Sequence, residues 1–174
     1  MSERTLVLRR LELRDQDDVT AAVAEMAAEG EHWSYRYRGD LPWPDYVRLV
    51  HGWEDGIDLP EDFVAHAELV AEVDGEVVGR SSIRWELNDF LRRLGGHIGY
   101  AVRPAHRRQG YATEILRQSV QILRDRGVHR ILVTCDDDNL ASARVIEANG
   151  GVLEAVVPHD DPDEPPRRRY WISA

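Results

Sequence analysis

The order of apolar and polar residues along the chain predicts an alternation of strands and helices. Apolar residues alternate with polar ones over residues 6–13, which predicts a half-buried strand. Residues 16–29 carry apolar side chains at helical spacing, with Asp15 before them as a helix cap and Gly30 after them as a stop. A second short helix is predicted from Pro44 to about Glu54.

The pattern becomes rich in strands from residue 66 onward. AELVAEV and EVVGRSSIRWEL predict two strands, and the Asp74-Gly75 pair between them is typical of a tight hairpin turn. A loop at 88–95 is expected before a third short strand, GHIGYAV. Glu86 is expected where the second of these strands closes, and His97 where the third begins.

The second half of the chain alternates helices and strands. Helices are predicted over 111–126, ending at Gly127, and over 139–149. Strands are predicted over 130–135, 152–157 and 167–172, with an acidic turn at 159–166 before the last one. The strand, helix and strand within 97–135 form a right-handed crossover, which places the two strands parallel. The predicted fold class is α/β (α+β), in one domain spanning 1–174, because no repeat or long linker divides the chain.

Composition excludes several chemistries. The chain has 174 residues with 32 acidic and 22 basic ones, and all 22 basic residues are Arg, for a net charge of −10. Without Lys there can be no Walker P-loop, no pyridoxal Schiff base and no Ser-Lys hydrolase. The acidic balance also argues against nucleic acid as the main partner. Cys135 is the single cysteine and is interpreted as a core thiol, which fits a reducing cytoplasm.

No signal peptide or membrane span is predicted. The first residues, MSERTLVLRRLELRD, alternate in polarity and contain no continuous apolar stretch. No run elsewhere approaches transmembrane length. We therefore expect a cytoplasmic protein with no membrane partner.

One stretch carries most of the chemical information, GYAVRPAHRRQGYAT at residues 99–113. The strand ends at Val102, Pro104 has no N–H with which to continue the pairing, and the loop opens directly into a helix. Gly110 allows a ligand to approach the backbone closely, and the small Ala112 leaves the first helical turn unobstructed. Between Val102 and Tyr111 the sequence contains Arg and His but no acid. Cations beside a helix N-terminus predict a pyrophosphate site.

With this motif the sequence resembles the GNAT superfamily of acyl-CoA-dependent N-acetyltransferases. The loop of that superfamily, Arg/Gln-x-x-Gly-x-Gly/Ala, is present as residues 107–112, and its next strand, Asn and helix are present as ILVTCDDDNLASARVIEANGG. More narrowly, SIRWELNDFLRRLGGHIGYAVRP, VTCDDDN and RRYWI resemble a bacterial subgroup of predicted acetyltransferases. The resemblance implies a central mixed, mostly antiparallel sheet of about seven strands with flanking helices. It also implies a splayed parallel pair of strands at the CoA site.

The resemblance implies acetyl-CoA as co-substrate and a set of residues that bind it. Backbone groups of the strand would pair with the pantetheine, and the loop with the first helical turn would hold the pyrophosphate. Two residues of the following block would reach the cofactor from the other side. The implied cofactor-binding residues are Tyr100, Ala101, Val102, Arg107, Arg108, Gln109, Gly110, Tyr111, Ala112, Thr113, Asn139 and Ser142.

Direct attack of an amine on a thioester needs a base, a donor for the oxyanion and an acid for the thiolate. A backbone N–H at the end of the strand is the candidate donor. His97, with a reference pKa of about 6.5, and Glu86, acting through water, are the candidate bases. Many family members carry a Tyr four residues before the Gly that ends the second helix, where this chain has Ile146. Ser142, Tyr111 or water could replace that acid, or the thiolate could leave without one.

Three further groups have competing interpretations. The aromatic residues at 33, 35, 37, 43, 46 and 53 are interpreted as core, with the walls of an acceptor pocket as the alternative. The acidic residues at 54, 55, 58, 61 and 62 are interpreted as a solvated loop, or as a rim that attracts a cationic amine. The Asp136–Asp138 run lacks the spacing of a calcium loop, so we expect no metal and a loop that caps the helix at Asn139.

We expect an N-acetyltransferase that moves an acetyl group from acetyl-CoA to a primary amine of a small molecule or peptide in a ternary complex. Two alternatives stay open: transfer of another acyl group, and a CoA-binding regulatory module without turnover. The missing Tyr is the reason to keep the second one. The expected partners are acetyl-CoA and an amine acceptor, and a homodimer through the last strands is left open.

Overall fold

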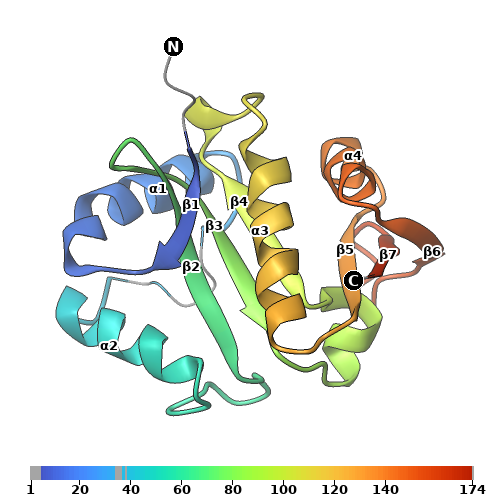
Figure 1. Cartoon of the computed structure of the whole chain (residues 1–174), viewed down its shortest axis with the longest axis horizontal. Helices are drawn as coiled ribbons and strands as arrows, with labels where there is room; N and C mark the ends of the chain where they lie inside the picture. The colour runs from blue at the N-terminus through green and yellow to red at the C-terminus, as the bar shows by residue number, and fades with distance from the viewer. Residues whose placement is uncertain (1–4, 34–36, 38, 174) are drawn as a thin grey trace.

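A seven-stranded sheet organises the computed structural model of the chain, which describes residues 5–33, 37 and 39–173 (Figure 1). The strands are β1 (Val7–Arg10), β2 (His66–Val73), β3 (Glu76–Arg84), β4 (Ile98–Val102), β5 (Arg130–Asp136), β6 (Val152–Val157) and β7 (Arg167–Ser173). Their order is β1-β2-β3-β4-β5-β7-β6, and every neighbouring pair is antiparallel except β4 and β5. The predicted mixed sheet with one parallel pair is confirmed.

Four α-helices cover the two faces of this sheet. They are α1 (Gln16–Ala28), α2 (Trp43–Trp53), α3 (Tyr111–Asp125) and α4 (Leu140–Ala148). Figure 1 shows α3 lying across β3 and β4, with α4 beside it and α1 and α2 at the opposite side of the sheet. We call the two sides the α3 face and the α1/α2 face.

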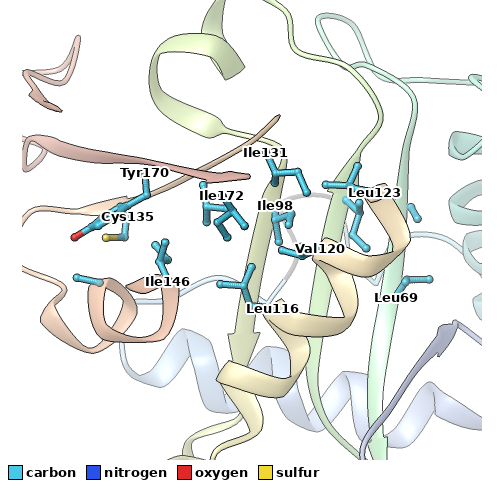
Figure 2. Packing of buried hydrophobic residues seen from close by; sticks show 14 residues of the cluster. Leu69, Ile98, Leu116, Val120, Leu123, Ile131, Cys135, Ile146, Tyr170 and Ile172 are labelled. Atoms are coloured by element: carbon cyan, nitrogen blue, oxygen red, sulfur yellow. The ribbon is translucent and has the colours of Figure 1, made fainter. Parts of the chain in front are cut away.

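The α3 face is closed by the main apolar core. Leu116, Val120 and Leu123 of α3 point toward Ile98 of β4 and Ile131 of β5 (Figure 2). Gly79 of β3 allows the close approach of α3, because a Cβ there would lie 2.8 Å from the Ile115 side chain and 2.7 Å from the carbonyl of Ala101. This core extends from β2 to β7 and so holds the two halves of the sheet together.

A second core lies under α1 and α2. Trp33, Trp43, Tyr46 and Trp53 are buried there together with aliphatic residues of both helices. The interpretation of these aromatic residues as core is confirmed, while Tyr35 lies outside the described residues.

Two local predictions differ from the structure. The expected loop at 88–95 contains one wide helical turn, η2 (Leu91–Gly95), because Leu91 and Leu94 are buried and draw the segment onto the sheet. Asp15 precedes α1 but does not cap it with its side chain. Its carboxylate instead accepts hydrogen bonds from the Arg9 guanidinium (2.7 Å) and the Glu12 N–H (2.7 Å). No helix in the described part of the chain is long and apolar enough to cross a membrane.

Candidate functional site

The sheet opens between its two parallel strands. β4 and β5 pair at a single position, Ile98 with Val133, just after the His97 N–H donates to the Leu132 carbonyl (2.7 Å). Along β4, alternate residues form their backbone hydrogen bonds with β3. The residues between them, Tyr100 and Val102, direct their N–H and C=O groups away from β3, toward the gap where β5 has separated. This gap presents strand hydrogen-bonding groups that an extended ligand could pair with.

The loop after β4 leads into the N-terminus of α3. Gly110 occupies the cap position with φ +82°, and Arg108 has φ +62°. Gly110 has no side chain with which to cap the helix, so the N–H groups of the first turn remain available to an anion. The one acid of that turn, Glu114, is held by Arg117 at 2.6 Å. Arg117 keeps the pKa of Glu114 below its usual value.

The sequence contains no acid between Val102 and Tyr111, but in the fold two arginines of this loop have acidic partners from elsewhere in the chain. Arg103 is buried and ion-paired with Glu25 of α1 at 2.7 Å, and Arg107 is paired with Glu29 at 2.7 Å. Arg108 is exposed and makes no ion pair in the described part of the chain. Two of the three cations therefore tie the loop to α1, because the fold supplies acids from a distant segment of sequence.

Two polar side chains meet across the gap. The Tyr100 hydroxyl of β4 lies 2.7 Å from Ser142 Oγ at the start of α4. Asn139 caps α4 by accepting a hydrogen bond from the Ser142 N–H at 3.0 Å, so the cap is Asn139 itself and not the Asp136–Asp138 run that was expected to provide it. Burial raises the pKa of Tyr100, so its hydroxyl stays protonated at neutral pH. The structure thus brings Tyr100, Asn139 and Ser142 to one place.

His97 has a structural environment. It is 6% exposed, and its Nδ1 accepts a hydrogen bond from the Leu132 N–H at 2.9 Å, which leaves the ring proton on Nε2. Burial, with the nearby charge of Arg84, lowers the pKa of His97 to about 4. A ring whose free nitrogen is already bonded does not serve as a base, so this geometry disfavours the sequence expectation for His97.

Glu86 is also poorly placed for catalysis. β3 ends at Arg84, so Glu86 lies two residues beyond the strand and is exposed. This position is past the closed end of the β4–β5 pair, whereas the predicted anion site is at the open end.

Glu68 is an acidic residue of the α1/α2 face that the sequence did not single out as a candidate. On β2 it pairs with Ser82 of β3, which pairs with Gly99 of β4, so the three residues form one row on the α1/α2 face. Its side chain is 20% exposed, and His66 Nε2 lies 3.6 Å from its carboxylate. The signal was present in the sequence: Glu68 interrupts the apolar positions of a strand that is buried on both faces.

The acidic run after β5 pairs with the arginines of β7. Asp136 lies 2.9 Å from Arg167, and Asp137 lies 2.7 Å from Arg168. No three His, Cys, Asp or Glu side chains come together as a metal site within residues 5–33, 37 and 39–173.

Comparisons with known proteins agree with this architecture. No relative was found among curated proteins. Among solved structures, a putative acetyltransferase, YncA of Salmonella typhimurium, determined with acetyl-CoA, is 17% identical with a TM-score of 0.64, over 97% of this chain and 93% of that one. RimJ of Mycobacterium smegmatis, in complex with CoA-disulfide, is 21% identical with a TM-score of 0.68, over 97% and 82%. An acetyltransferase of the GNAT family from Bacillus anthracis is 20% identical with a TM-score of 0.69, over 99% and 96%.

The sequence itself matches a family across most of its length. Residues 5–152 match the family described as Acetyltransferase (GNAT) domain. This range runs from β1 to the start of β6 and includes the opened strand pair and the loop before α3. The chain therefore belongs to the GNAT acetyltransferase family.

Proposed function

We propose that this protein is an acetyl-CoA-dependent N-acetyltransferase that acts on a primary amine of a small molecule or a peptide. The observation that carries the proposal is the parallel pair that opens after Ile98 and leads into an uncapped helix N-terminus at Gly110. Family membership and the ligands named for the similar structures support the choice of cofactor.

The residues at the opening fit a CoA molecule. A Cβ at Gly110 would meet no atom within 4 Å, so the space in front of the first turn of α3 is clear. The N–H groups of Tyr111, Ala112 and Thr113 would bind the pyrophosphate, with Arg108 and Gln109 beside them. The backbone of Tyr100 and Val102 would pair with the pantetheine, and Ala101 would lie between them on the strand.

Acetyl-CoA would supply an activated acyl carbon. The amine nitrogen forms a bond to that carbon, the carbon–sulfur bond breaks, and the thiolate takes one proton as the amine loses one. We assign the proton uptake from the amine to Glu68, through water and Ser82, because Glu68 shares a row with Gly99 on the α1/α2 face. We assign protonation of the thiolate to the Tyr100–Ser142 pair.

Two glycines at opposite ends of α3 allow a matched test. Gly110 and Gly127 have φ of +82° and +83°, and a Cβ at either would meet no atom within 4 Å. Alanine at either position should therefore cost a similar amount of stability, about 1 kcal/mol. We expect Gly110→Ala to weaken acetyl-CoA binding about tenfold or more, as measured by calorimetry, and Gly127→Ala to leave it unchanged.

The outcomes separate the alternatives. Equal affinities in the two variants would contradict the pyrophosphate assignment. Tight acetyl-CoA binding without CoA release for any primary amine would instead favour a regulatory module without turnover.

A further inference from the structure

The unpaired polar atoms of the protein are concentrated on one face. Within the described residues, five buried side-chain nitrogen or oxygen atoms have no hydrogen bond: Arg80 Nε, Arg167 Nε, Arg169 Nε, Trp171 Nε1 and Asp136 Oδ1, the last of which still lies 2.9 Å from Arg167 Nη1 in an ion pair. Four of the five are donors. Burying an unpaired donor is unfavourable, so a group of them indicates a place where a ligand supplies the missing acceptors.

Strand register places all five on the α1/α2 face. On β7, Tyr170 and Ile172 belong to the core under α3 and α4, so Arg167, Arg169 and Trp171 point the other way. On β3, Ser81 contacts Ser119 of α3 at 2.7 Å, so its neighbour Arg80 also lies on the α1/α2 face. Asp136 pairs with Arg167 across the sheet and shares its side.

Arg80 and Arg169 flank the opening, one on each side. Arg80 pairs with Ala101 of β4, at one edge of the gap. Arg169 pairs with Thr134 of β5, at the other edge, and Thr134 follows the last position at which β5 pairs with β4. Arg169 thus lies across the opening from Gly99, so an acceptor whose amine lies over β4 would extend across the opening toward Arg169.

The acids nearby pair with Arg167 and Arg169 but do not use all of their N–H groups. Arg169 contacts Glu154 through Nη2 at 3.2 Å, and Arg167 contacts Asp136 through Nη1 at 2.9 Å, so each guanidinium keeps other N–H groups for a ligand. The Arg167 and Arg169 side chains are 28% and 21% exposed, so solvent reaches them. Arg80 makes no ion pair within the described residues; its one contact is a long hydrogen bond of 3.5 Å to the His32 carbonyl.

We propose that the acceptor of this enzyme carries an oxoanion, a carboxylate or a phosphate, in addition to its amine, and that Arg169 with Trp171 and Arg167 binds that oxoanion. This inference rests on the proposed function, because it names the substrate class of the same site. A guanidinium fork suits the paired oxygens of a carboxylate or phosphate, and the indole N–H adds a further donor. Glu68 on the opposite side of the gap keeps the amine end distinct from the anion end.

The kinetic test uses pairs of amines with and without the oxoanion, and kcat/KM is expressed per unprotonated amine because loss of the oxoanion also lowers the amine pKa. Phenylalanine is compared with phenylalanine amide, and phosphoethanolamine with ethanolamine, by release of CoA thiol. We expect a preference in kcat/KM of about tenfold or more for the oxoanion member of at least one pair, and the pair that shows it distinguishes carboxylate from phosphate. Arg169→Gln should reduce that preference to less than about threefold. Arg169→Lys, which keeps a charge without the fork, should retain an intermediate preference.

A binding measurement makes the test independent of turnover. Protein saturated with CoA, so that the helix N-terminus is occupied, is titrated with acetate and with inorganic phosphate at constant ionic strength, and the melting temperature is followed. We expect a saturable rise with at least one anion, its loss in Arg169→Gln and its retention in Arg48→Gln, which alters an exposed arginine on α2. The expected unfolding curve of Arg169→Gln without anions matches that of the unmodified protein.

The results separate this inference from the proposed function. CoA binding and amine turnover with no oxoanion preference, or no saturable anion effect, would overturn the inference and leave the proposed function standing. Failure to bind acetyl-CoA at all would overturn the proposed function instead.

Discussion

The two faces of the sheet differ in how completely their polar groups are paired. Under α3, even the buried hydroxyls are satisfied, since Ser81 Oγ and Ser119 Oγ lie 2.7 Å apart and Ser119 also donates to the Ile115 carbonyl at 2.8 Å. On the α1/α2 face, Arg80, Arg169 and Trp171 retain buried donors without partners among the described residues. Both faces carry an apolar core, but in the described part of the chain only the α1/α2 face also carries the energetic cost of unpaired donors, which a substrate can offset.

The largest expected effect tests the α3 face. Leu116 is 0% exposed and packs at the centre of the core that joins the two halves of the sheet. We expect Leu116→Ala to lower the free energy of unfolding by about 3 kcal/mol, from lost apolar contact and the cavity left behind. Urea unfolding followed by circular dichroism measures it. A loss below about 1 kcal/mol would mean that this face is not the main source of stability.

The next effect concerns His97, beside the junction of β4 and β5, and is a dependence of stability on pH. The folded-state pKa of His97, about 4, lies below its unfolded value of 6.5, so the unfolded protein binds the proton more tightly. Stability from this residue is complete above pH 6.5 and is lost as the pH falls toward 4, by up to about 3 kcal/mol at about 1.4 kcal/mol per pH unit.

His97→Asn separates a structural from a catalytic role. The Asn side chain offers an oxygen to the Leu132 N–H but does not titrate, so the variant should lose this acid-dependent part of the unfolding curve. Its rate of acetyl transfer at pH 7 to 8 should stay within about threefold of the unmodified protein. A loss of a hundredfold or more with normal folding would restore His97 as the base.

The smallest expected effect tests the unpaired donors of the α1/α2 face. Arg80→Met removes a buried donor without a partner, and a methionine side chain of similar length can fill the space. We expect the free energy of unfolding to change by less than about 0.5 kcal/mol, or to rise, in contrast to Leu116→Ala. A loss above about 1 kcal/mol would show that Arg80 contributes to stability and would weaken the contrast between the faces.

Local patterns were sufficient to predict most of the fold. Alternation and helical spacing located each strand and α-helix of the described residues, and the crossover predicted within 97–135 located the parallel pair. The η2 turn was missed because its two buried leucines have no periodic neighbours; their burial depends on β5, which lies far along the chain.

Which side chains contact one another was harder to predict than where the helices and strands lie. Arg107 was expected beside a phosphate, but its partner Glu29 lies 78 residues away, and only the packing of α1 brings it close. His97 was expected to be a base because its reference pKa suits that role, and its burial against Leu132 depends on the register of two strands. The arginines of β7 were visible in the sequence, but which of them face the opening follows from the core positions of Tyr170 and Ile172.

The single pairing between Ile98 and Val133 also has a mechanical consequence. Four strands lie on one side of it and three on the other, and on the α3 face the shared core spans both sides. The two halves are therefore joined along the line of the Ile98–Val133 pair and the core packed against Ile98, part of which Figure 2 shows. A widening of the opening that keeps this core intact would have to turn about that line.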